Sequence, residues 1–283
     1  MSDIDNFTND SAMMIAYERA LESCRPDALF NDPLASALAG SKGETLSTNF
    51  GGACAMFEFP DWPEFHKMWT AVRTKFIDDQ VSKLASSGDF QQLVNCGAGM
   101  DTRAYRLECY SAFSKGSFEV DMEVINRNKL TIFKDLLDAP IPYCSVVNVS
   151  LDFLSEEKTL SSELRAPFDA ALPSIFVSEG LVMYLGRVGK FKLLRDVSAV
   201  SAPGSVFILQ FLDASESKKA KEDPSVLEHA LSAEEATITL SGLGWGEFVV
   251  SKYGDESLNF GRFASCRFEP SASFSFLVCK KVA

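Results

Sequence analysis

The sequence predicts an α/β fold built on a mainly parallel sheet, and three observations point to it. After Gly88, seven short apolar runs alternate with longer amphipathic stretches, which is how strands and helices alternate along the chain in such a fold. The last two runs have no strong helical pattern between them, so we expect the sheet to end in an antiparallel pair. The chain has 283 residues, of which 46% are hydrophobic, and can therefore bury a substantial core.

Each element has a local signal. Residues 11–24 and 63–86 carry helical patterns, whereas Pro26 and Pro33 interrupt the chain between them. Residues 41–59 are rich in glycine and small side chains, which predicts a loop. The predicted strands are residues 92–96, 117–120, 144–149, 174–178, 205–212, 246–252 and 274–279. Helices are predicted at residues 102–113, 123–137, 155–165, 187–200 and 232–243.

The change of pattern after Gly88 also suggests how the chain is divided. We expect residues 1–88 to form an N-terminal helical cap or lid and residues 89–283 to form the sheet domain. Residues 213–231 are charged and polar, and they follow the fifth predicted strand. This segment is predicted to be a second lid element inserted into the sheet domain.

Composition excludes several classes of protein. The formal net charge is −12 and the pI is about 4.7, so the chain repels a phosphate backbone and we expect no nucleic-acid partner. The basic stretch at 218–221 is interleaved with acids and predicts a solvated helix face. Seven widely spaced cysteines without a CxxC motif fit neither a disulfide framework nor a zinc site, so we expect no metal and a reducing compartment. Without a signal peptide or an 18-residue apolar stretch, we expect a cytoplasmic protein with no membrane partner.

A glycine turn follows the first predicted strand in the stretch LVNCGAGMDTRAYRL. It places Gly97, Ala98 and Gly99 at the carboxyl end of that strand, where open parallel sheets bind their ligands. Glycine permits unusual backbone dihedrals and a close approach by a ligand. The third glycine of a G-x-G-x-x-G motif is replaced by Thr102, which weakens a dinucleotide interpretation. A plain strand–helix junction remains an alternative for the turn considered alone.

Acidic residues end the next three predicted strands. Asp121 lies about 20 residues past the turn, where a carboxylate can accept hydrogen bonds from ribose hydroxyls. Asp152 could accept from an adenine amino group, with Phe153 beside the ring. Glu179 closes an apolar strand, and a carboxylate there is costly to bury without a partner. The turn and these acids together indicate a nucleoside cofactor, either a dinucleotide or S-adenosylmethionine.

The same stretches resemble a known family. LVNCGAGMDTRAYRL, followed by EVD and SEGLVMYL, resembles the leucine carboxyl methyltransferase family, particularly its bacterial-type branch of S-adenosylmethionine-dependent methyltransferases. The segments MIAYERALESCRPDALFNDPLA and AVRTKFIDD resemble two further signatures of that branch. The resemblance runs from about residue 11 to residue 279. It implies a class I methyltransferase fold, which is Rossmann-like with a mostly parallel seven-stranded sheet and an antiparallel last strand, plus the N-terminal cap.

The resemblance also implies roles for individual residues. Arg73 matches the arginine that binds the methionine carboxylate of the cofactor, and Arg19 matches a basic position that approaches the same end. Glu179 would face that end too. The remaining cofactor-binding positions line its backbone, hold its ribose or border its adenine; these are Gly97, Ala98, Gly99, Asp121, Met122, Asp152 and Phe153.

Methyl transfer from a sulfonium needs positioning and desolvation but no nucleophilic side chain. His66 could act as a general base, and Tyr184 could hydrogen-bond the acceptor, although structural roles are common for both residue types. A carboxylate acceptor would need no base, because it is already ionised. Aromatic residues of the cap could wall an apolar acceptor pocket or could pack as core; they are Phe50, Phe57, Phe59, Trp62, Phe65 and Trp69.

We therefore expect a small-molecule acceptor, methylated on a carboxylate or hydroxyl oxygen. Methylation of a protein C-terminal carboxylate is the alternative within the family. A nicotinamide-dependent oxidoreductase and a non-catalytic binding protein are the alternatives from other classes. Arg103 stands in the first turn of a predicted helix, where a positive charge opposes the helix dipole, so we expect it to pair with an acid or to point toward a substrate.

Overall fold

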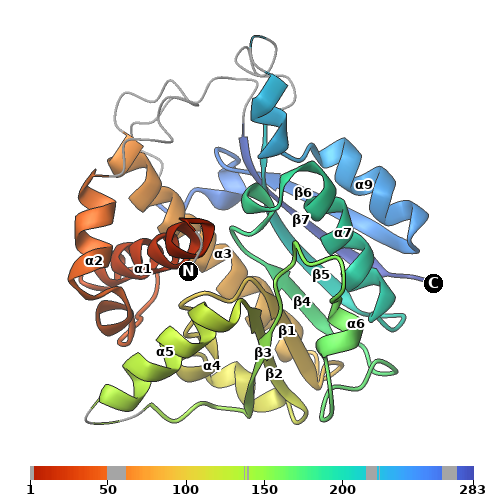
Figure 1. The fold of residues 1–283 in the computed structure, drawn as a ribbon, viewed down its shortest axis with the longest axis horizontal. Coiled ribbons are helices and arrows are strands. Elements are labelled where there is room, and N and C mark those ends of the chain that lie inside the picture. Colours follow the sequence, from red (N-terminus) through yellow and green to blue (C-terminus); the bar gives the residue numbers. More distant parts are fainter. Residues whose placement is uncertain are drawn as a thin grey trace.

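A computed structural model describes residues 3–49, 62–136, 138, 140–214, 222, 224–262 and 273–283. Its centre is a seven-stranded sheet with the order β3-β2-β1-β4-β5-β7-β6 (Figure 1). The strands are β1 Gln92–Cys96, β2 Gly116–Asp121, β3 Val146–Ser150, β4 Ile175–Ser178, β5 Val206–Asp213, β6 Trp245–Lys252 and β7 Ser273–Lys281. Every predicted strand is present, and its ends agree to within two residues. The short apolar runs were therefore a reliable signal.

Six of the strands run in the same direction. Strands β1 to β5 pair in parallel, whereas β7 pairs antiparallel with both β5 and β6. The predicted antiparallel pair at the end of the sheet is thus confirmed, and β7 is the reversed strand. Because β1 and β4 are central, the glycine turn after β1 and the acid after β4 leave the same edge of the sheet side by side.

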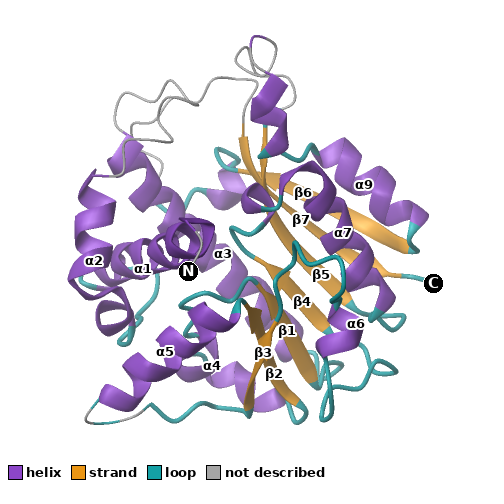
Figure 2. Cartoon of the chain, viewed as in Figure 1, coloured by secondary structure: helices purple, strands orange, loops and turns teal. Residues whose placement is uncertain are grey.

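Helices cover both faces of the sheet (Figure 2). Alternate residues of each strand point to opposite faces, so Leu93 joins one hydrophobic cluster and Val94 the other. The first cluster includes residues of α3, and the second includes residues of α6, α7 and α9. The helices are α1 Asp3–Ser23, α2 Ala35–Asn49, α3 Trp62–Ala85, α4 Arg103–Arg106, α5 Glu123–Asp135, α6 Leu160–Glu163, α7 Gly186–Ala199 and α9 Ala233–Gly242.

Several expectations about helices were wrong. Residues 35–49 form helix α2, although residues 41–59 were predicted to be a loop. The small residues that suggested a loop instead let α2 pack closely against α1, and the chain kinks at Gly40, whose φ is 54°. The predicted helix at 102–113 is split into α4 and a 3-10 turn, Glu108–Ala112. Helix α1 also begins earlier than predicted, at Asp3, and only Leu160–Glu163 of the helix predicted at 155–165 is helical.

Gly43 of α2 lies close to the backbone of α1. A Cβ atom at this position would lie 2.5 Å from the carbonyl oxygen of Met13, which is much shorter than a real contact. We expect Gly43→Ala to lower the free energy of unfolding by about 1–3 kcal/mol, because α1 must shift away. Gly242→Ala, in α9, is the matched control since a Cβ there meets nothing within 4 Å. Urea titration monitored by circular dichroism measures both, and equal stabilities would contradict the expectation.

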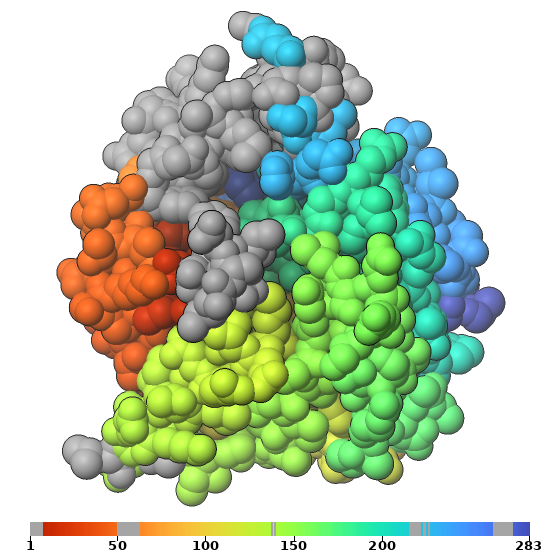
Figure 3. All heavy atoms as spheres, viewed as in Figure 1, coloured from red at the N-terminus to blue at the C-terminus, as the bar shows by residue number. Residues whose placement is uncertain are grey.

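Helices α1 and α2 lie together on one side of the molecule (Figure 3). The division into a cap at 1–88 and a sheet domain at 89–283 remains a prediction. Part of the proposed lid at 213–231 lies outside the described residues, and so do Phe50, Phe57, Phe59 and the lysines of 218–221. Within the described ranges, the helices are too short or too polar to cross a membrane.

Candidate active site

The glycine turn follows β1 and is hydrogen-bonded to the neighbouring strand β2. Gly97 and Gly99 have φ values of 73° and 51°, which favour glycine, and the N–H groups of Gly97 and Ala98 both point to the carbonyl of Val120. A Cβ at Gly97 would lie 3.1 Å from the side chain of Leu181. The two glycines are therefore required by the backbone geometry of the turn, whether or not a ligand is bound.

Helix α1 also lies close to this turn. A Cβ at Gly99 would lie 3.3 Å from the Cβ of Ala12. The side chain of Asn128, in α5, donates to Asn9 of α1 at 2.9 Å, so α1 is also tied to the helix that follows β2. The close approach that Gly99 allows is thus used by a helix of this chain, an explanation that sequence reasoning did not include.

Asp121 is held at the end of β2 by two backbone groups. Its carboxylate accepts from the N–H of Gly99 at 2.7 Å and from the N–H of Met122 at 2.7 Å. The side chain is buried, and burial raises the pKa of Asp121 to about 6 although both hydrogen bonds act to lower it. Each oxygen keeps capacity for a further donor, as binding of a ribose diol requires.

Glu179 follows β4 and is paired with two arginines. One oxygen accepts from Arg73 Nε at 2.8 Å, and the other lies 2.8 Å from Arg103 Nη1. Burial alone would raise the pKa of Glu179, but Arg103 and Arg73 outweigh burial and hold that pKa below its usual range. The partner that a buried carboxylate requires is therefore supplied by the chain, not only by a ligand.

Arg73 presents two unused nitrogens at this place. It is 5% exposed and comes from α3, which packs on the sheet. Among the described residues only its Nε has a hydrogen-bond partner, and neither Nη1 nor Nη2 has one. A Cβ at Gly180 would lie 3.3 Å from Nη1, so these nitrogens lie beside the backbone that follows Glu179. A nearly buried guanidinium with two free donors fits a carboxylate ligand.

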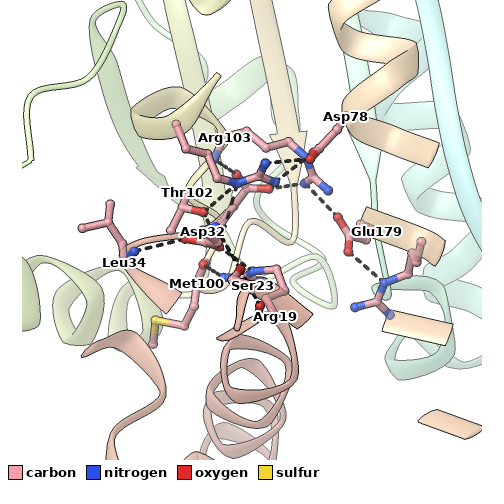
Figure 4. A network of polar contacts seen from close by, with 12 residues as sticks. Arg19, Ser23, Asp32, Leu34, Asp78, Met100, Thr102, Arg103 and Glu179 are labelled. Atoms are coloured by element: carbon pink, nitrogen blue, oxygen red, sulfur yellow. Dashed lines mark hydrogen bonds and ion pairs between the residues drawn. The ribbon is translucent and has the colours of Figure 1, made fainter. Parts of the chain in front are cut away.

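Arg103 pairs with acids, as its position in the helix suggested. It is 3% exposed and contacts Asp78 of α3 at 2.7 Å, Asp101 of the glycine turn, and Glu179 (Figure 4). Asp101 also accepts from the Arg103 backbone N–H at 2.6 Å. Burial would raise the pKa of Asp101, yet Arg103 and other cations lower it to about 2.

The ion pairs continue from Asp78 to the N-terminal segment. Arg106 binds both oxygens of Asp78, at 2.6 and 2.9 Å, and Thr102 donates to Asp32 at 2.7 Å. Arg19 donates to Asp32 at 2.9 Å and also to the carbonyl of Met100 in the glycine turn (Figure 4). Arg19 therefore connects α1 to the turn through protein groups, and direct contact with a cofactor remains a prediction.

The two candidate catalytic side chains both contact α1. Tyr184 lies five residues after Glu179, and its hydroxyl is 2.7 Å from the hydroxyl of Ser11. Burial raises the pKa of Tyr184. His66 Nδ1 lies 2.8 Å from a carboxylate oxygen of Glu18, which also accepts from Thr70 at 2.6 Å. His66 is therefore oriented by a buried carboxylate, which suits a base and a structural residue equally.

The remaining candidates are spread over the same region. Asp152 is exposed, and its side chain accepts from the N–H of Leu154 at 2.8 Å; Phe153 is buried in the second hydrophobic cluster. Their contact with adenine remains a prediction. Phe65 and Trp69 are fully buried against Tyr253, Phe274 and Phe276, so they pack as core and do not wall a pocket.

A pocket of about 460 Å³ lies at the side of this region. It is bounded by Phe30, Tyr105 and Tyr143 and by the ion pair of Asp78 with Arg106. Neither the glycine turn nor Glu179 lines it, so pocket size alone would point to a different place from the residue chemistry. The specific binding groups, the nitrogens of Arg73 and the carboxylate of Asp121, lie outside this pocket.

Sequence reasoning did not identify Asp78, Asp32 or Glu18 as members of this region. The position of Arg103 in a first helical turn predicted that it had an acidic partner, but not which acid. Asp78 lies in the stretch AVRTKFIDD, and the resemblance of that stretch to a family signature was the available signal. Among the described residues, no group of three or more His, Cys, Asp or Glu side chains is arranged to hold a metal ion.

Comparisons with known proteins place the chain in a family. The sequence profile of the family described as leucine carboxyl methyltransferase matches residues 12–198. A Streptomyces coelicolor protein named "putative S-adenosyl-L-methionine-dependent methyltransferase" is 34% identical over 203 residues, which are 69% of this chain and 66% of that protein. A Mycolicibacterium gilvum protein of the same description is 30% identical over 251 residues, covering 85% of this chain and 79% of its own length. With several relatives, the match spans less than two thirds of their length.

Solved structures show the same fold. A duf574 family protein from Streptomyces avermitilis superposes with a TM-score of 0.61 at 18% identity, covering 96% of this chain and 97% of that one. A Thermobifida fusca protein described as a "putative methyltransferase" gives a TM-score of 0.57 at 19% identity, covering 86% of this chain and 90% of that one. The predicted class I methyltransferase fold is confirmed, and the relatives' names carry the cofactor that the sequence predicted. The chain belongs to the leucine carboxyl methyltransferase family.

Proposed function

We propose that this protein transfers the methyl group of S-adenosyl-L-methionine to an oxygen of a small molecule, a carboxylate or a hydroxyl. The observation that carries this proposal is the arrangement around Arg73. A nearly buried guanidinium has two nitrogens without a partner among the described residues, beside Glu179 and on the same edge of the sheet as the glycine turn and Asp121. Arg73 would bind the carboxylate of the methionine moiety and Asp121 would bind the ribose, two polar parts of this cofactor that flank its sulfonium.

The residues present fit that cofactor. Arg73 would bind the methionine carboxylate through Nη1 and Nη2, and Asp121 would accept from the ribose hydroxyls. Glu179 would accept from the amino group, since each of its oxygens has capacity for another donor beside the arginines. When bound, the cofactor supplies an electrophilic methyl group on a sulfonium, which already has a good leaving group. The chain's part is then to orient the donor and acceptor and to exclude water.

Tyr184 and His66 are the groups that we propose for the acceptor. The Tyr184 hydroxyl is hydrogen-bonded to the Ser11 hydroxyl and follows the end of β4 in the chain. It could therefore orient an acceptor oxygen beside Glu179. His66, held by Glu18, could accept the proton of a hydroxyl acceptor. A carboxylate acceptor needs only Tyr184, because it is already ionised. The two chemistries therefore differ in whether His66 is required.

The proposal is tested by incubating the protein with S-adenosyl-L-methionine carrying a labelled methyl group and a metabolite extract. A labelled small molecule that appears with the wild type but not with Tyr184→Phe supports it. Retained activity in His66→Gln would indicate a carboxylate acceptor, and lost activity a hydroxyl acceptor. Label that enters protein C-termini instead would favour the family alternative. Binding of S-adenosylhomocysteine without product in any fraction would leave a binding protein and reject the proposed activity.

Asp121 gives this binding a pH dependence. Because ribose hydroxyls need the ionised carboxylate, we expect affinity for S-adenosylhomocysteine to fall by up to about ten-fold per pH unit below pH 6. The effect of Asp121 on the stability of the ligand-free protein has the opposite sign. The folded state binds this proton more tightly than the unfolded chain does, so the free energy of unfolding falls as the pH rises through about 6. Calorimetry between pH 5 and 8 measures the affinity, and Asp121→Asn should flatten the profile. A flat wild-type profile would remove Asp121 from the site.

A further inference from the structure

We propose that Arg103 is a positioning residue for the amino-acid end of the methyl donor, a role that rests on the proposed function. Arg103 need not contact the cofactor to act in this way. It holds Glu179, and Glu179 holds Arg73 by its Nε atom, so the free nitrogens of Arg73 are set in place through Arg103.

The contacts of Arg103 come from three separate elements. Nε binds Asp78 of α3 at 2.7 Å, and Nη1 contacts both Asp101 of the glycine turn and Glu179 after β4, the latter at 2.8 Å (Figure 4). Asp78 and Glu179 are buried or nearly so, with side chains 7% and 12% exposed. One guanidinium therefore joins the helix that carries Arg73, the glycine turn and the acid beside Arg73.

The charges in this network are balanced. Four arginines face four carboxylates within it; these are Arg19, Arg73, Arg103 and Arg106 with Asp32, Asp78, Asp101 and Glu179. The carboxylate of Asp78 is shared by Arg103 and Arg106, whereas Glu179 is shared by Arg103 and Arg73. At the Arg73 end of this chain of ion pairs, two guanidinium nitrogens have no partner among the described residues. The arrangement holds Arg73 in one orientation and leaves its terminal nitrogens for a ligand.

This role requires arginine and not simply a positive charge. Arginine presents nitrogens in a planar fork and can bond several acids in fixed directions, whereas lysine offers one ammonium nitrogen on a flexible stem. A lysine at position 103 could keep the local charge but could not span Asp78 and Glu179 in the same geometry. The conservative change therefore separates positioning from charge.

The experiment compares two ligands that differ in their amino-acid group, the part that Arg103 would position through Glu179 and Arg73. S-adenosylhomocysteine carries the amino-acid carboxylate and amine, whereas 5′-methylthioadenosine lacks both but keeps the adenine and ribose. We expect Arg103→Lys to raise the Kd of S-adenosylhomocysteine about ten-fold and to change the Kd of methylthioadenosine less than about two-fold. Arg127→Lys is the matched control, because Arg127 is exposed and pairs with Glu123 on the surface of α5.

Isothermal titration calorimetry measures both constants, and thermal melting shows whether each variant is folded. If Arg103→Lys does not fold, Asp78→Asn serves in its place, since it removes the acid that holds Arg103 Nε, and the same selective loss is expected. Equal weakening of both ligands, or no weakening of either, would overturn the positioning role. A wild type that binds neither ligand would overturn the proposed function as well. Selective loss for S-adenosylhomocysteine, with Arg127→Lys like the wild type, supports the inference.

Discussion

Arg73→Met is expected to weaken binding of S-adenosylhomocysteine about a hundred-fold. The change removes two free guanidinium nitrogens that would each bond the ligand carboxylate. Hydrogen bonds to charged groups contribute about 1.5 kcal/mol or more each, so losing two costs about 3 kcal/mol, or roughly a factor of a hundred in Kd. Methionine keeps the long apolar stem of the side chain and hence much of its packing against neighbouring groups.

The variant should nevertheless fold. Glu179 would keep Arg103 at 2.8 Å, so the carboxylate would not be left buried without a cation. Loss of Arg73 would raise the pKa of Glu179, since one of the two arginines that lower it is gone. Calorimetry on the purified variant gives the Kd, and Arg195→Met on the exposed side of α7 is the control. An Arg73→Met protein that is folded and binds as the wild type does would exclude Arg73 from the cofactor site.

Lys129→Met is expected to lower the free energy of unfolding by about 3–5 kcal/mol at neutral pH. Lys129, in α5, reaches Glu119 in the middle of β2 at 2.6 Å, and both side chains are fully buried. Removing one partner of such a pair leaves an uncompensated charge in the interior, which is strongly destabilising. Burial raises the pKa of Glu119 even though Lys129 lowers it, so without the lysine the carboxyl should take up a proton.

That proton uptake provides an internal check. The double variant Lys129→Met with Glu119→Gln should recover a large part of the lost stability, because no unpaired charge remains. Arg127→Met, on the same helix, removes an exposed ion pair with Glu123 and should change stability by less than about 0.5 kcal/mol. Urea unfolding at pH 7 compares the three. A single variant as stable as the Arg127→Met control would contradict the prediction.

Local signals in the sequence predicted much of the fold. Strand β1 and its glycine turn were readable because an apolar run followed by Gly97 and Gly99 is a short-range pattern. The reversed strand β7 was predicted from the absence of a helix before it. Helix α2 was missed, since its small residues resemble a loop and are explained only by the contact of Gly43 with α1.

The sequence supplied candidate site residues but not the contacts among them. Asp121, Glu179 and Arg73 were identified from strand ends and from the family resemblance, and the structure brings the last two into contact across 106 residues of sequence. The same structure gives Glu179 a second arginine, which no local pattern indicated. Sequence reasoning had assigned a ligand to satisfy Glu179, whereas the chain itself supplies two cations.

The sequence alone determined the order of strands and helices, the glycine turn and the acids that follow the strands. These features depend on residues close together in the chain, whose periodicity and turn chemistry are fixed locally. Only the tertiary structure decided which of the 39 acidic residues meets which arginine. An ion pair forms between atoms a few ångströms apart, and the sheet and α3 bring Asp78, Arg103 and Glu179 to that distance.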